Sequence, residues 1–145
     1  MSAPMDETRL RCLRTLRREI SRTKVRMAKL EKRCGDERDE ELLQELEKTR
    51  EALTHYLRAA QKEETALIAY IDGIEDAAMR EIFMLRYVDG VRSWQKIAFL
   101  AGEYDESYVR RKHAAFLKKE AKKASEARGK PQTSDVFQSN VTSAK

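Results

Sequence analysis

Apolar residues near the start of the chain recur at alternating intervals of three and four positions. They are Leu13, Leu16, Ile20, Met27, Leu30 and Cys34, with Thr23 at the remaining position of the series. This spacing is typical of the a/d seam of a coiled coil, and it predicts one long amphipathic helix. Gly35 can take the left-handed conformation that ends a helix, and Asp36 suits the start of the next one.

A second amphipathic helix is predicted from about Asp39 to Tyr70. Its apolar stripe consists of Leu42, Leu43, Leu46, Leu53, Tyr56, Leu57, Ala60, Leu67 and Ile71. Because only a short break separates two helices of similar length, residues 1–72 are expected to form an antiparallel, coiled-coil-like helical hairpin. One side of the apolar seam stays open in such a hairpin, which favours homo-oligomerisation or docking of a partner there.

Three shorter helices are predicted within residues 73–124. The first runs from about Ile74 to Tyr87 and ends before Gly90, with Asp72 or Asp76 as its cap. Its expected buried face consists of Ile74, Ala78, Ile82 and Leu85.

The second and third of these helices form a predicted helix-turn-helix. Ser93 is a good N-cap for a helix over Trp94–Ala101, and the third helix starts near Ser107 and continues to about Ala124. Gly102 is placed for the positive φ of the turn. The residues expected in the small core are Ala98 at the helix crossing and Ile97, Leu100 and Val109 around it.

The third helix divides into an inner and an outer face at about 100° per residue. The inner face holds Val109, His113, Phe116 and Leu117, and His113 is expected to be partly buried. The outer face holds Ser107, Arg111, Ala114, Ala115, Lys118 and Lys122. Small alanines allow a helix to approach base edges, while Arg and Lys reach guanine or phosphate.

Duplex DNA is therefore the expected partner of this helix. From Tyr108 to Lys123 it carries seven Lys or Arg against one acidic residue, which favours salt-sensitive binding to phosphates. The candidate DNA-binding residues are Ser107, Tyr108, Arg110, Arg111, Ala114, Ala115, Lys118, Lys119 and Lys122, joined by Trp94, Gln95 and Lys96 at the start of the preceding helix. For Trp94, core packing is an equally good interpretation. A basic, solvated helix of an ordinary bundle is the alternative for the whole set.

The composition agrees with an all-α fold, because 38% of the residues are charged and only 7% are aromatic.

The net charge alternates along the chain, at +7 for residues 1–34, −6 for 35–72 and +4 for 73–145. We interpret the basic residues of the first helix as a solvated face paired with the acidic second helix, in preference to a nucleic-acid or lipid surface. Residues 125–145 are polar and aperiodic, and a disordered tail is expected there.

Nothing in the sequence indicates catalysis, a cofactor or a metal. His55 and His113 are isolated, and no nucleophile–base arrangement accompanies them. Cys12 and Cys34 are 22 residues apart on one predicted helix, about 33 Å, which excludes a disulfide between them. No apolar run could span a membrane and no secretory signal is present, so the expected location is the cytoplasm.

The run MREIFMLRYVDGVRSWQKIAFLAG, followed by YVRRKHAAFLKK, resembles the fourth conserved region of bacterial sigma factors. It is more similar to the sigma-like late transcription activators of Gram-positive prophages, of the ArpU/RinA type. The likeness covers roughly Ile74–Lys119, about a third of the chain. It implies an upstream helix ending at Leu85–Tyr87, a turn at Asp89–Gly90, and a base-reading helix that opens with Val109–Arg111.

The resemblance implies a transcription regulator that binds a promoter and contacts RNA polymerase through Ile74–Tyr87. The chain carries a helical hairpin in place of a promoter-melting region, so a complete sigma factor is not expected. Two alternatives stay open. A small terminase-like subunit that recognises phage DNA for packaging would form a closed ring, and a helical protein-interaction module would bind protein tightly and DNA negligibly.

Overall fold

The computed structural model describes residues 5–37, 39–103 and 105–144, and the surroundings of side chains up to residue 127. Within these ranges it is all-helical and contains no strand, which confirms the predicted fold class. The elements are α1 (Glu7–Leu10), α2 (Cys12–Asp36), α3 (Glu40–Asp72), α4 (Ala77–Phe83), the π-helical turn η1 (Met84–Val88), α5 (Trp94–Leu100) and α6 (Glu106–Ala144).

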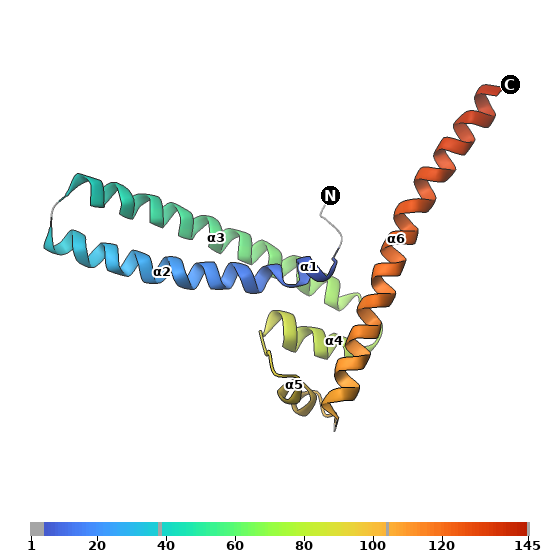
Figure 1. The fold of residues 1–145 in the computed structure, drawn as a ribbon, viewed down its shortest axis with the longest axis horizontal. Helices are drawn as coiled ribbons and strands as arrows, with labels where there is room; N and C mark the ends of the chain where they lie inside the picture. The colour runs from blue at the N-terminus through green and yellow to red at the C-terminus, as the bar shows by residue number, and fades with distance from the viewer. Residues whose placement is uncertain (1–4, 38, 104, 145) are drawn as a thin grey trace.

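The long helices α2 and α3 lie side by side and run in opposite directions (Figure 1). Every predicted seam position of α2, from Leu13 to Cys34, is buried or half-buried. On α3 the prediction is wrong for Leu43 and Leu57, whose side chains are exposed, and Thr49 is buried in the seam. Each of these leucines follows a seam residue directly, and one residue rotates a side chain by about 100° around the helix.

The break between α2 and α3 also differs from the prediction. Gly35 is not left-handed; it lies within α2, which continues to Asp36. Asp36 does not start the second helix. That role belongs to Asp39, whose carboxylate accepts a hydrogen bond of 3.0 Å from the backbone N–H of Glu41.

Ion pairs join the basic α2 to the acidic α3. They are Arg17–Glu64 at 3.9 Å, Arg50–Glu31 at 3.8 Å, and Arg26–Glu45. Their side chains are well solvated, so each pair contributes at most about 1 kcal/mol and mainly selects the partner and direction of each helix.

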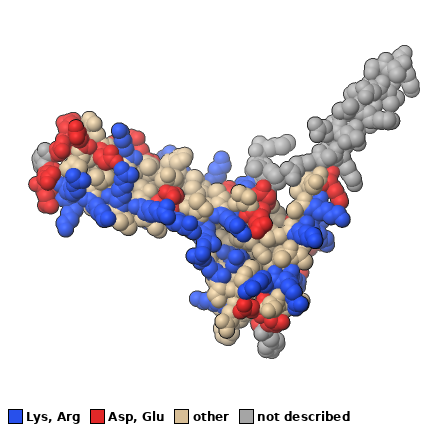
Figure 2. Space-filling view, viewed as in Figure 1, with Lys and Arg blue, Asp and Glu red and all other residues tan. Residues whose placement is uncertain are grey.

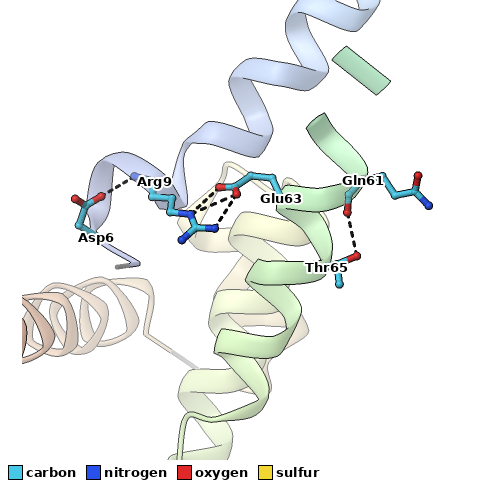
Figure 3. A network of polar contacts seen from close by, with 5 residues as sticks. All are labelled: Asp6, Arg9, Gln61, Glu63 and Thr65. Atoms are coloured by element: carbon cyan, nitrogen blue, oxygen red, sulfur yellow. Dashed lines mark hydrogen bonds and ion pairs between the residues drawn. The ribbon is translucent and has the colours of Figure 1, made fainter. Parts of the chain in front are cut away.

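A better-shielded ion pair fixes α1 against α3. Arg9 donates from Nε and Nη2 to both carboxylate oxygens of Glu63, at 3.0 and 2.9 Å, and each side chain is only 17% exposed (Figure 3). These hydrogen bonds raise the pKa of Arg9 above its ordinary value. Asp6 caps α1 by accepting from the backbone N–H of Arg9. Helix α1 is thereby held against α3.

One hydrophobic core joins the base of the α2–α3 hairpin to the helices that follow. It contains Leu10 and Leu13 from the start of the chain, Leu67 and Ile71 from α3, and the buried residues of the later elements, Ile74, Met79, Ile82, Phe83, Val88, Ile97, Ala98 and Val109. Phe83 lies at the centre of this core, and its side chain is completely buried. The orientation of the hairpin relative to α6 is therefore set by packing.

The helix predicted over Ile74–Tyr87 is shorter and less regular than expected. Asp76 caps α4 by accepting from the backbone N–H groups of Ala78 and Met79, at 3.0 and 3.3 Å, and Ile74 is buried ahead of the helix. Met79 and Phe83 are fully buried, whereas Ala78 and Leu85 are only half-buried. Leu85 lies within the π-helical turn η1, which changes the face that the chain presents after Phe83.

Helix α6 is longer than the sequence analysis predicts. Its backbone is helical to Ala144, whereas the expected helix ends near Ala124 and a disordered tail is expected over 125–145. Lys, Ala and Glu fill most of residues 118–127, and their high helix propensity favours continuation past Ala124. The side chains beyond residue 127 lie outside the described residues.

Alanine substitutions at two glycines are expected to change the free energy of unfolding in opposite directions. We expect Gly102→Ala to lower the free energy of unfolding by about 1 kcal/mol, because Gly102 has φ +78° and an alanine there is strained even without a steric neighbour. Gly35→Ala is expected to raise it by about 0.5 kcal/mol, because Gly35 is helical and has open space around it. Urea denaturation of both variants measures the difference; equal effects would contradict these backbone assignments.

Candidate nucleic-acid interface

The α5–turn–α6 unit has the local geometry that its sequence predicts. The Ser93 hydroxyl accepts from the backbone N–H of Lys96 at 3.2 Å, which caps α5. Beyond α5, Gly102 donates to Phe99 O at 3.2 Å and Glu103 donates to Ala98 O at 2.8 Å. This pair of bonds is a Schellman motif, which requires the left-handed Gly102.

The small core of this unit is nearly as predicted. Ile97, Ala98 and Val109 are buried where the two helices cross. Leu100 was expected among them, but it is 45% exposed. It lies at the last position of α5, next to the 80% exposed Phe99.

The outer face of α6 is exposed along its whole predicted length. We call it the recognition face; it comprises Ser107, Arg111, Ala114, Ala115, Lys118 and Lys122, all exposed. On the inner face Val109 and His113 are buried, and Phe116 and Leu117 are half-buried against the core. Packing of one face therefore turns the other face outward.

Three basic residues of α6 have local polar contacts. Arg110 forms an ion pair with Glu106 at 2.9 Å, and Arg111 Nε donates to Ser107 O at 3.3 Å. Lys112 lies 3.4 Å from Asp76 and so ties α6 to the start of α4. Lys112 is thereby engaged within the fold, while Arg111 stays on the solvated side with Tyr108, Lys119 and the rest of the recognition face.

The start of α5 lies beside the start of α6. Gln95 and Lys96 are exposed and line a groove of about 680 Å³ together with Ser93, Ala98, Phe99, Glu103, Asp105 and Glu106. This places Gln95 and Lys96 beside the start of α6. The carboxylates of Glu103, Asp105 and Glu106 at the turn would repel a phosphate. The positive charge that would attract one lies on Lys96 and farther along α6.

Trp94 does not point toward this groove. Its ring lies 4.8 Å from the ring of His113, and the guanidinium of Arg86 stacks over it at 4.2 Å. Of the two interpretations that the sequence leaves open, this geometry favours packing. Arg86 is not among the residues predicted from the sequence, although a basic residue shortly before the Asp89–Gly90 turn was an available signal.

His113 is the buried polar residue at the centre of this packing. Its Nε2 and the Tyr87 hydroxyl are 2.6 Å apart, and the Phe83 and Tyr87 rings lie 5.4 and 5.7 Å from its ring. Burial, and then the charge of Arg86, lower the pKa of His113 to about 4. Burial also raises the pKa of Tyr87. Both groups are neutral near pH 7, as a packing role requires.

The second half of the recognition face has a neighbour. Met5, Asp6 and Glu7 lie across a cavity of about 360 Å³ from Ala114, Leu117, Lys118, Glu120, Ala121 and Ala124. The first turns of α6, from Ser107 to Arg111, lie away from this cavity. In the space-filling view, Lys and Arg gather along α2, where the helical hairpin meets the later helices, and on the first half of α6 (Figure 2).

Among the described residues, no cluster of His, Cys, Asp and Glu could hold a metal ion. No helix in the described part of the chain has the length and apolarity needed to cross a membrane. No family model matches the chain, and the searches of curated proteins and solved structures found no significant similarity.

Proposed function

We propose that this protein is a sequence-specific transcription regulator that binds duplex DNA through α6. The single observation that carries the proposal is the asymmetry of this helix. One face is anchored by the buried Val109 and His113, and the opposite recognition face is exposed and basic at its ends, with alanines between. A helix of this kind can enter the major groove without disturbing the core behind it.

We assign separate roles to the exposed side chains of this unit. Ser107, Arg111, Ala114 and Ala115, on the outer face of α6, are proposed to contact base edges. Gln95, Lys96, Arg110 and the lysines at 118, 119 and 122 flank them and suit phosphates. Tyr108, which is partly exposed, lies beside Arg111 and can pack against the sugar backbone.

The resemblance to the fourth sigma region supports the same assignment and adds a regulatory class. The positive φ of Gly90 agrees with the turn that the resemblance implies at Asp89–Gly90. We therefore propose a sigma-like prophage regulator, in which contact with RNA polymerase would use the exposed positions of α4, Ala77 and Glu81.

A titration of full-length protein into a fluorescent duplex, at low salt, tests DNA binding. The double variant Arg111→Ala with Lys118→Ala is expected to weaken binding about thirtyfold, since each lost contact costs about 1 kcal/mol. The dependence of affinity on salt should also become shallower, by about one in the log–log slope, because Lys118 is the phosphate contact of the pair. The duplexes come from a selection on random sequences, which is expected to return a defined motif.

A matched control removes the same two charges elsewhere. Arg58→Ala with Lys62→Ala changes exposed residues of α3, and this variant should bind DNA as the unmodified protein does. Equal weakening in both double variants would show that only overall charge matters and would contradict the recognition face. Selection without an enriched motif would contradict sequence specificity.

A further inference from the structure

A cleft rich in arginine lies between the start of α2 and the segment that joins η1 to α5. Its volume is about 290 Å³, and we call it the arginine cleft. It is lined by five guanidinium groups and two carboxylates, from Arg11, Arg14, Arg17, Arg86, Arg92, Glu7 and Asp89. Leu10, Tyr87, Val91 and His113 complete its wall. Cationic groups therefore converge here from two parts of the chain far apart in sequence.

Three of the five guanidiniums already have partners. Arg11 pairs with Glu7 at 2.9 Å. Arg17 donates to Val88 O at 2.5 Å and lies 3.9 Å from Glu64. Arg86 donates to Arg92 O at 3.2 Å and stacks on Trp94. The bonds to backbone carbonyls hold Arg17 and Arg86 at the wall of the cleft, whereas the Arg11–Glu7 pair is solvent-exposed.

Arg14 and Arg92 differ from the other three. Within the described part of the chain, neither side chain forms an ion pair or hydrogen bond. Partial desolvation, and then the positive charges of Arg92, Arg18, Arg86 and Arg11, lower the pKa of Arg14. His113 adds no positive charge near pH 7, since its pKa is about 4. An anion in the cleft would relieve the repulsion between these guanidiniums.

We propose that the arginine cleft is a binding site for a phosphate-bearing anion with at least two negative charges, held chiefly by Arg14 and Arg92. The planar guanidinium donates paired hydrogen bonds that match the oxygens of phosphate. Two sources share this chemistry: a free polyphosphate, such as the phosphate chain of a nucleotide, and successive phosphates of a nucleic-acid duplex. The site does not include the recognition face, so it does not depend on the proposed function.

Calorimetric titration of the full chain with sodium tripolyphosphate, at constant ionic strength, tests the first source. One equivalent is expected to bind, and Arg14→Gln with Arg92→Gln should lower the affinity at least tenfold. The matched control, Arg33→Gln with Arg58→Gln, removes two exposed arginines outside the cleft and should leave the affinity unchanged. Thermal unfolding without ligand checks that all variants are folded.

The same variants are then titrated with duplex DNA to test the second source. If tripolyphosphate does not bind, a tenfold loss of duplex affinity in Arg14→Gln with Arg92→Gln, and not in the control, assigns the site to duplex phosphates. Equal behaviour of both double variants toward both probes would overturn the proposal. The Arg111→Ala with Lys118→Ala protein should keep its tripolyphosphate affinity, which separates failure of this site from failure of the recognition face.

Discussion

Phe83→Ala is expected to lower the free energy of unfolding by about 3–5 kcal/mol. The Phe83 side chain is fully buried, and it touches residues from three other elements. Its ring centre lies 5.2 Å from those of Tyr87 and Phe116 and 6.3 Å from that of Tyr70. The cavity left by alanine would lie where α3, η1 and α6 meet, and local shifts of the surrounding side chains could close little of it.

Phe99→Ala is the matched control, because the chemical change is the same and the ring is 80% exposed. Its expected effect is below about 0.5 kcal/mol. Urea denaturation followed by circular dichroism measures both variants. Similar losses of stability in the two proteins would show that the core is not centred on Phe83.

Acidification is expected to destabilise the protein through His113. Its pKa is about 4 in the fold and close to 6.5 in an unfolded chain, so the unfolded state binds the additional proton between these values. Stability is therefore complete above about pH 6.5 and falls as the pH decreases toward 4. The largest loss of unfolding free energy that this shift allows is about 3 kcal/mol. The His113 ring borders the arginine cleft, where solvent partly screens its charge, so the expected loss is about 2 kcal/mol.

His113→Gln isolates this contribution, because the amide can keep a hydrogen bond to the Tyr87 hydroxyl and does not titrate. Free energies of unfolding are measured for both proteins at pH 7.0 and 4.5. The unmodified protein should lose about 2 kcal/mol more than the variant over this interval. Parallel pH profiles would contradict a buried, neutral His113.

The fold was predictable where side-chain periodicity determines it. The seam from Leu13 to Cys34, the cap at Ser93 and the left-handed Gly102 follow from local rules, and the structure confirms each of them. Leu43, Leu57 and Leu100 were assigned to the interior because they are apolar, yet tertiary packing leaves them exposed. For Leu43 and Leu57, the partner helix decides which of two adjacent apolar residues is buried; at the end of α5, Phe99 and Leu100 are both exposed.

The recognition face was also predictable, because one amphipathic helix contains all of it. The arginine cleft was not, since its residues come from α2 and from the segment around Asp89, which meet only in the folded chain. The orientation of Trp94 needed the structure for the same reason. Its contact with His113 joins residues 19 positions apart across the turn.

The shared core has a mechanical consequence. Leu10 and Leu13 lie in one packed cluster with Val109, so the base of the hairpin cannot swivel independently of α6. The 25 residues of α2 project about 38 Å from this base. A partner bound at the distant tip would therefore orient the hairpin and α6 together, and under the proposed function it would set the direction from which α6 meets the duplex.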